Sequence, residues 1–217
     1  MKLTTSQGIA FEASESGDAR ARRAVLLIHD WWGVQDYNRE WADRFARRGY
    51  LAMVVDLYGG RTTDDAKVAG ALMQALDQNE ANGKLAAAVA HLAEGGRPVA
   101  VLGWSFGGRQ ALLTACANPG QVRACVMFYS RIVTDAAMLR QLGGPVLAVF
   151  AERERDWPDK MVDFERAMTR AGKDLRPVSF DAAHGFVNPA GSRYDEEAAD
   201  DAWDATCVFL DEVVPPA

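Results

Sequence analysis

The chain has 217 residues, of which 49% are hydrophobic and 25% charged, and its formal net charge at pH 7 is -6. This balance excludes an intrinsically disordered chain, because half of the residues can fill a core and the net charge is small for the length. It also excludes a typical nucleic-acid-binding surface, since no basic run is longer than Arg20-Ala21-Arg22-Arg23. The expected partners are therefore small molecules.

Apolar runs in the chain are short. Residues 24–28 and 145–151 fall far below the roughly 18 to 20 residues that a membrane span needs. Residues 1–8 carry one cation and no apolar stretch, so a secretion signal is not expected. The expected location is the cytoplasm. The three cysteines, at 116, 125 and 207, lack a C-x-x-C spacing, which indicates small buried side chains rather than disulfides or a zinc site. No bound metal is expected.

The alternation of apolar patterns along the chain predicts the fold class. No repeat or low-complexity linker is visible, so residues 1–217 are predicted to form a single domain. Short apolar runs alternate with longer amphipathic ones, which is typical of a mostly parallel sheet with helices on both faces. Eight strands are predicted, at residues 2–6, 9–14, 23–29, 50–56, 98–104, 124–129, 145–151 and 175–181. The first two should pair as an antiparallel hairpin at an edge of the sheet.

The segments between the strands have helical spacing, and helices are expected in them. In residues 34–48, Tyr37, Trp41 and Phe45 recur every four residues, and Gly49 follows as a helix terminator. Similar patterns occupy residues 63–78, 83–93, 106–117, 135–142, 159–171 and 195–213.

A candidate nucleophile lies where the apolar run from residue 98 ends. Gly103-Trp104-Ser105-Phe106-Gly107 is a G-x-S-x-G sequence between a predicted strand and a predicted helix. So tight a turn requires very small residues two positions before and two after the serine. The N–H of Phe106, at the start of the helix, would then stabilise negative charge that develops during a reaction. The alternative is an ordinary strand end with Ser105 as a helix N-cap.

A serine hydroxyl becomes nucleophilic only when a base takes its proton, and three histidines are available. His91 lies within a predicted helix and is expected at the surface or its boundary. His29 ends a strand near the edge where ligands bind in such sheets, but a structural role is expected. His184 follows the last predicted strand after a two-residue loop, so the order nucleophile, acid, histidine is that of an α/β-hydrolase. We predict that His184 is the general base.

The acid of such a triad should follow the strand at 145–151. Its role is to fix the histidine tautomer and to stabilise the imidazolium, which either a glutamate or an aspartate can do. Glu152, Glu154 and Asp156 all lie in this loop. The residues alone leave the choice among them open.

Four stretches resemble the dienelactone hydrolase family, and together they cover nearly the whole chain. They are residues 28–34 (Ile-His-Asp-Trp-Trp-Gly-Val), Gly49-Tyr50 with residues 56–59, residues 103–108 and residues 183–186 (Ala-His-Gly-Phe). The resemblance implies an α/β-hydrolase fold with a mostly parallel eight-stranded sheet, helices on both faces and no lid domain.

The resemblance also implies roles for individual residues. The nucleophile position of the family falls on Ser105 and its histidine on His184. Its acid falls on Glu154, which stands four residues before Pro158, although the family commonly has aspartate there. Asp156 is therefore the alternative acid.

Further positions around the nucleophile follow from the same resemblance. The second oxyanion N–H of the family corresponds to Trp31, and the acidic neighbour of its nucleophile to Asp30. Asp30, Trp32 and Tyr129 are expected to contact substrate. Aromatic residues are also expected to gather at this edge, some of them as part of the core and several of them near the serine, where they would favour an apolar, planar acyl or leaving group. They are Trp31, Trp32, Trp104, Phe106, Tyr129, Trp157 and Phe186.

Two differences separate the chain from the family's namesakes. They have cysteine in place of Ser105 and an arginine, which holds a substrate carboxylate, in place of Asn188. A serine favours general ester cleavage over thiolate chemistry. Arg131 is a candidate replacement for the missing cation, and the alternative is that it is simply solvated.

The expected protein is thus a cofactor-free serine hydrolase that cleaves a small carboxylic ester or lactone through an acyl-enzyme. One alternative is a non-catalytic protein that uses the same fold to bind a ligand. Another is an acyltransferase or peptidase with the same three residues, because the acyl-enzyme step is shared. A monomer or a small homo-oligomer is expected.

Overall fold

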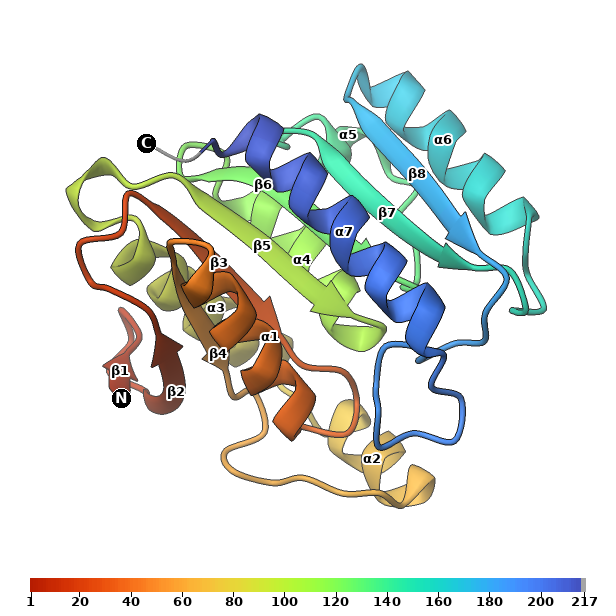
Figure 1. Cartoon of the computed structure of the whole chain (residues 1–217). Coiled ribbons are helices and arrows are strands. Elements are labelled where there is room, and N and C mark those ends of the chain that lie inside the picture. Colours follow the sequence, from red (N-terminus) through yellow and green to blue (C-terminus); the bar gives the residue numbers. More distant parts are fainter. Residues whose placement is uncertain (216–217) are drawn as a thin grey trace.

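The computed structural model describes residues 1–215 and contains an eight-stranded sheet in the order β1-β2-β4-β3-β5-β6-β7-β8 (Figure 1). β2 pairs antiparallel with β1 and β4, and all other neighbours are parallel. The strands are β1 (Lys2–Thr4), β2 (Ala10–Ser16), β3 (Arg23–Ile28), β4 (Tyr50–Val55), β5 (Val99–Trp104), β6 (Val122–Phe128), β7 (Val146–Ala151) and β8 (Leu175–Phe180). The eight predicted strands and the edge hairpin are confirmed.

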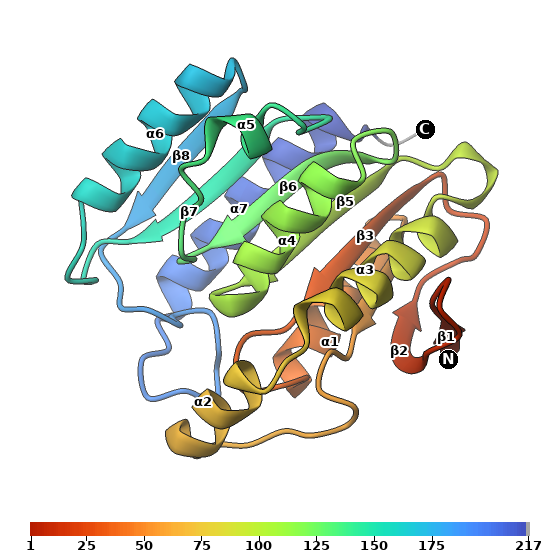
Figure 2. The ribbon, with the colours of Figure 1, turned by 180° about the vertical axis from the view of Figure 1, so that it is seen from behind.

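Helices cover both faces of the sheet, as predicted. The described residues form seven α-helices and one short 3-10 helix, η1 (Glu94–Gly96). The α-helices are α1 (Asp36–Arg47), α2 (Ala66–Gln74), α3 (Gln78–Leu92), α4 (Phe106–Ala117), α5 (Ala136–Leu139), α6 (Asp159–Ala171) and α7 (Glu196–Val213). α1 and α7 lie on one face, and α3 to α6 on the other (Figures 1 and 2). None of the described helices has the length and apolarity needed to cross a bilayer.

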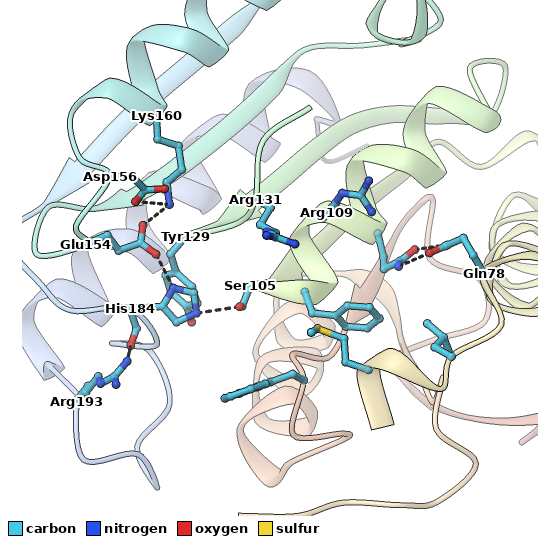
Figure 3. Close-up of a pocket in the computed structure, with 15 residues that line it drawn as sticks. Gln78, Ser105, Arg109, Tyr129, Arg131, Glu154, Asp156, Lys160, His184 and Arg193 are labelled. Atoms are coloured by element: carbon cyan, nitrogen blue, oxygen red, sulfur yellow. Dashed lines mark hydrogen bonds and ion pairs between the residues drawn. The ribbon is translucent and has the colours of Figure 1, made fainter. Parts of the chain in front are cut away.

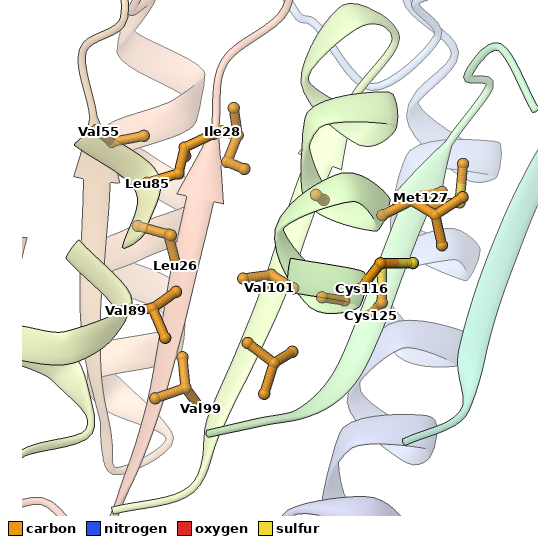
Figure 4. Packing of buried hydrophobic residues seen from close by; sticks show 14 of the residues in the cluster. Leu26, Ile28, Val55, Leu85, Val89, Val99, Val101, Cys116, Cys125 and Met127 are labelled. Carbon is orange, nitrogen blue, oxygen red and sulfur yellow. The ribbon is translucent and has the colours of Figure 1, made fainter. Parts of the chain in front are cut away.

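The two faces have separate hydrophobic cores because side chains along a strand alternate. In β3, Leu26 and Ile28 pack on the α3 side, beside Leu85 and Val89 (Figure 4). The intervening Val25 belongs to the core under α1 and α7. Each such fully buried side chain contributes about 1.5–3 kcal/mol of transfer free energy.

The prediction was wrong about the boundary between α2 and α3. α3 begins at Gln78, five positions before the expected residue 83, and α2 ends at Gln74. The reason is Asp77, whose carboxylate accepts the N–H groups of Asn79 and Glu80 and so caps the first turn of α3. This local cap outweighs the low helix propensity of Gly83.

The carboxyl ends of the parallel strands bring distant parts of the chain to one edge of the sheet. Asp30 follows β3, Ser105 follows β5 and Tyr129 follows β6. Glu154 follows β7, and His184 follows β8. Ligands bind at this edge in open α/β sheets, and the candidate site lies here.

Candidate active site

Ser105 stands at a strained turn between β5 and α4. Its backbone has φ 53° and ψ -112°, and its N–H donates to the Phe128 carbonyl oxygen at 2.8 Å. A Cβ on Gly103 would lie 2.1 Å from the Gly107 oxygen, and one on Gly107 would lie 2.1 Å from the Ile28 oxygen. The two glycines therefore permit the turn that exposes the serine hydroxyl.

The side chains of Ser105, His184 and Glu154 form one hydrogen-bonded chain (Figure 3). His184 Nε2 lies 2.8 Å from Ser105 Oγ, and His184 Nδ1 lies 2.6 Å from Glu154 Oε1. Because a carboxylate only accepts, Nδ1 donates to Glu154 and Nε2 is left to accept the serine proton. The arrangement can therefore deprotonate the hydroxyl.

The structure brings only one of the three candidate carboxylates to His184. Glu154 has a side chain that is 12% exposed, whereas that of Asp156 is 62% exposed. Asp156 instead lies 3.4 Å from Lys160 Nζ, and Glu152 accepts the Ser179 hydroxyl at 2.6 Å. The geometry thus favours Glu154 as the acid.

The other two histidines have structural surroundings. His29 is fully buried, and its Nδ1 lies 2.6 Å from the Asp30 carbonyl oxygen. Its Nε2 accepts the Leu57 N–H at 3.1 Å, so the ring is neutral with the proton on Nδ1. Burial lowers the pKa of His29, in agreement with this neutral form. His91 lies on α3 and pairs with Glu15 at 2.9 Å, and it does not line the cleft around Ser105.

Two backbone N–H groups near Ser105 have no acceptor among residues 1–215. They belong to Trp31, in the loop after β3, and to Phe106, the first residue of α4. The neighbouring Trp32 N–H is taken by Asp30 Oδ1 at 2.8 Å. Free donors of this kind can stabilise an oxyanion, and the roles of Trp31 and Phe106 in an oxyanion hole stay predictions.

Asp30 is a buried carboxyl group beside the cleft. Its side chain accepts the Trp32 N–H and the Tyr37 hydroxyl, the latter at 2.9 Å, and the residue is 6% exposed. Burial raises the pKa of Asp30 from 3.8 to about 6, although the two hydrogen bonds oppose the change. The folded protein therefore binds this proton more tightly than the unfolded chain does.

This shift gives a prediction for stability against pH. The stabilisation from protonated Asp30 is complete below pH 3.8 and is lost as the pH rises through about 6. Asp30→Asn removes the titration but keeps an acceptor for Trp32. From pH 4 to pH 8, the free energy of unfolding of the variant should rise relative to wild type by about 2–3 kcal/mol. Denaturant unfolding at both pH values measures this, and parallel pH curves would contradict it.

Ser105 lines a cleft that has two parts. Its larger part has a volume of about 770 Å³ and its smaller part about 390 Å³, and both are lined by Ser105, His184 and Tyr129. Met73 contributes an apolar wall to the larger part, and Asn188 lines the smaller one. The two parts can hold the two halves of an ester on either side of the nucleophile.

Four of the seven aromatic residues expected here line the cleft. They are Trp31, Phe106 and Tyr129 in the larger part, and Trp31, Trp32 and Tyr129 in the smaller one. Asp30, Trp32 and Tyr129 all line the smaller part, and their contacts with substrate stay predictions.

The other three aromatic residues belong to the core, as was expected for some of the seven. Trp104 and Phe186 are fully buried in the core under α1 and α7. The Trp104 side chain packs edge-on against Trp41, with ring centroids 5.3 Å apart. Trp157 packs against Phe150 on the opposite face, with ring centroids 6.1 Å apart.

Tyr129 is held in an unusual conformation beside His184. Its φ is 37°, and its ring centroid lies 4.9 Å from that of His184. Its hydroxyl is buried and has no hydrogen-bond partner among the described residues, and burial raises the pKa of Tyr129. Backbone strain concentrates at functional sites, and the positive φ of Tyr129 places such strain beside His184.

Several cleft residues were not singled out from the sequence. Lys160, on α6, lies against Glu154, and Arg109 and Arg193 line the larger part of the cleft. Gln78 and Gln110 exchange two amide hydrogen bonds, at 2.8 and 3.0 Å, and tie the start of α3 to α4. No motif marks these residues, since charged and amide side chains on helices usually face solvent. Among residues 1–215, no three His, Cys, Asp or Glu side chains gather as a metal site.

The parallel sheet, the serine at its strand-to-helix turn and the histidine and carboxylate that follow it in chain order define an α/β-hydrolase. A family model described as "Dienelactone hydrolase family" matches residues 11–214. The chain belongs to the dienelactone hydrolase family and is a carboxylic ester hydrolase.

Relatives of similar length share about a quarter of the residues. "Protein usf" of Aquifex pyrophilus is 28% identical over 201 residues, which cover 87% of each chain. A protein of Saccharolobus solfataricus named "Putative carboxymethylenebutenolidase" is 24% identical over 96% of each chain.

Solved structures share the fold. The dienelactone hydrolase-like promiscuous phosphotriesterase P91 from metagenomic libraries has a TM-score of 0.85 at 23% identity, covering 98% of this chain and 97% of that one. The dienelactone hydrolase of Anabaena variabilis has a TM-score of 0.76 at 19% identity, covering 99% and 96%. At these identities, the likeness supports the fold alone.

Proposed function

We propose that the protein cleaves small carboxylic esters or lactones through an acyl-enzyme on Ser105. The observation that carries this proposal is the unbroken chain of hydrogen bonds, 2.8 Å from Ser105 Oγ to His184 Nε2 and 2.6 Å from His184 Nδ1 to Glu154 Oε1. A hydroxyl so placed is both activated by a base and accessible from a cleft.

Acylation begins when His184 Nε2 takes the Ser105 proton and Oγ attacks the carbonyl carbon. Glu154 stabilises the imidazolium that forms. The N–H groups of Trp31 and Phe106 donate to the oxyanion of the tetrahedral intermediate. His184 then gives its proton to the leaving alkoxide, and the carbon–oxygen bond of the ester breaks.

Deacylation repeats these steps with water as the nucleophile. His184 takes a proton from water, the hydroxide attacks the acyl carbon, and Ser105 leaves with the proton that His184 returns. An open-chain ester gives an acid and an alcohol. A lactone gives one product, a hydroxy acid, because its alcohol stays attached to the acyl group.

The charge of the cleft favours substrates that carry an anionic group. Arg109 and Arg131 line its larger part, and none of the ion pairs found among residues 1–215 includes either of them. In Figure 3 both guanidinium groups lie to the right of Glu154 and His184. In a chain with a net charge of -6, two unpaired arginines in the cleft would attract a substrate anion selectively.

Substitution of these arginines tests the preference. Arg131→Gln and Arg109→Gln should each raise KM about fivefold for an ester with a free carboxylate, since an exposed ion contact contributes up to about 1 kcal/mol. KM for the uncharged analogue should not change. The exposed Arg140, at the end of α5, provides the control Arg140→Gln. Equal changes for charged and uncharged esters would show that neither arginine reads the charge.

Labelling with a fluorophosphonate tests the proposed function itself. Intact-mass measurement should find one adduct on the wild type and none on Ser105→Ala. Folded protein that takes no adduct would instead favour a ligand-binding protein. An added alcohol or amine that captures most of the acyl group would favour an acyltransferase.

A cytoplasmic location is also proposed. It is supported by Cys116, Cys125 and Cys207, which are all buried and unpaired. Structural disulfides are rare in reducing compartments, where free thiols persist.

A further inference from the structure

Glu154 uses its two carboxylate oxygens for two different partners. Oε1 accepts from His184 Nδ1 at 2.6 Å, and Oε2 accepts from Lys160 Nζ at 2.5 Å (Figure 3). The side chains of Lys160 and Glu154 are only 9% and 12% exposed. The carboxylate is thus clamped between the imidazole and an ammonium group.

The burial of Lys160 calls for an explanation. Lysine is almost never buried unless it is paired, because desolvation of the ammonium is costly. Lys160 lies in the first turn of α6, one residue after Asp159, where a cation gains nothing from the helix dipole. Its stabilising contacts are Glu154 and, at 3.4 Å, the exposed Asp156.

The contact between Glu154 Oε2 and Lys160 Nζ restricts a long side chain. Glutamate has one more rotatable bond than aspartate, so its carboxylate has more ways to turn from the histidine. A bond to the second oxygen removes that freedom. It also leaves a single oxygen, Oε1, for the imidazole.

We propose that Lys160 is a positioning residue that holds Glu154 against His184 and thereby keeps the imidazole oriented toward Ser105. This inference rests on the proposed function, because it assigns Lys160 a role in that relay. Lys160 acts through Glu154 and does not bind substrate, since its ammonium group already faces two carboxylates.

The first test measures steady-state kinetics on an uncharged nitrophenyl ester. Lys160→Met should lower kcat about tenfold. In metal sites, loss of a residue that orients a ligating histidine has an effect of this size. KM should stay within about twofold of wild type, and Lys160→Arg should recover most of kcat, because guanidinium also pairs with a carboxylate. If Lys160→Met does not fold, Lys160→Gln takes its place. A rise in KM with unchanged kcat would overturn the proposal and make Lys160 a substrate contact.

A matched control separates positioning from general stability. Lys84 is 8% exposed in its side chain and pairs with Glu80 at 2.7 Å, but it lies on α3, outside the catalytic cleft. Lys84→Met therefore also removes the ion pair of a buried lysine. It should leave kcat unchanged, and an equal loss of kcat in both variants would overturn the proposal.

A double-mutant cycle tests whether Lys160 works through Glu154. In the Glu154→Gln background there is no carboxylate to hold, so Lys160→Met should lower kcat no further. If the two losses multiply as independent effects, the proposal fails.

A second readout requires no substrate. The proton on His184 Nδ1 should give a low-field NMR signal in the wild type and Lys160→Arg, and exchange with solvent should remove it in Lys160→Met. Protein that takes no fluorophosphonate but shows this pattern would contradict the proposed function and support the role of Lys160. Normal fluorophosphonate labelling together with an NMR signal that survives in Lys160→Met would support the proposed function and contradict the role of Lys160.

Discussion

Replacement of Ser105 by alanine should lower kcat for ester hydrolysis by about a millionfold, as loss of the nucleophile does in serine proteases. The side-chain hydrogen bonds of His184 lead to Glu154 and to the Ser105 hydroxyl. Loss of that hydroxyl therefore leaves the imidazole without a nucleophile to activate. Ser130 provides the control. It is 4% exposed, and its hydroxyl donates to the Phe128 oxygen at 3.0 Å, so Ser130→Ala should keep the rate.

The same position gives a stability result that checks folding. Ser105 has φ 53°, in a region that serine and alanine rarely adopt. Ser105→Ala should therefore be about as stable as wild type, whereas Ser105→Gly should gain about 1 kcal/mol through relief of strain. Thermal unfolding of both variants measures the difference. Hydrolysis by Ser105→Ala near the wild-type rate would refute the nucleophile.

Sequence patterns predicted that Ser105 and His184 lie at one edge of the sheet, where the structure has them, because the constraints on the two residues are local. The glycines around Ser105 are required by backbone contacts at 2.1 Å, and such contacts leave a readable spacing. His184 follows β8 after a short loop, so chain order alone brings it to the sheet edge. The sheet was predictable for a similar reason, since buried parallel strands appear as short apolar runs.

Other features depend on the direction of side chains, which spacing does not reveal. Trp104 directly precedes Ser105, but alternation along β5 turns its side chain into the core under α1 and α7. Met73 reaches the cleft from α2, a helix that carries no motif. Lys160 looks like an ordinary surface lysine until the fold brings α6 to the loop after β7.

The choice between Glu154 and Asp156 also required three dimensions. The two carboxylates are two residues apart in a charged loop, and either could orient an imidazole. The path of the loop after β7 turns Glu154 inward and leaves Asp156 62% exposed. Their substitution should therefore have very different effects.

Glu154→Gln should lower kcat about ten-thousandfold, the loss caused by an equivalent change of the triad acid in serine proteases. The amide keeps the shape but carries no charge to stabilise the imidazolium, and its NH₂ group can favour the wrong histidine tautomer. Asp156→Asn should keep kcat within about twofold, because its only contact in the site is the 3.4 Å approach to Lys160. Kinetics on an uncharged ester compare the two variants directly.

The shorter Glu154→Asp separates charge from reach. It keeps the negative charge, but its carboxylate cannot span both His184 Nδ1 and Lys160 Nζ, which the glutamate contacts at 2.6 and 2.5 Å. Its kcat should fall between those of wild type and Glu154→Gln. A larger loss in Asp156→Asn than in Glu154→Gln would transfer the role of the acid to Asp156, because the exposed carboxylate would then have to turn inward during the reaction.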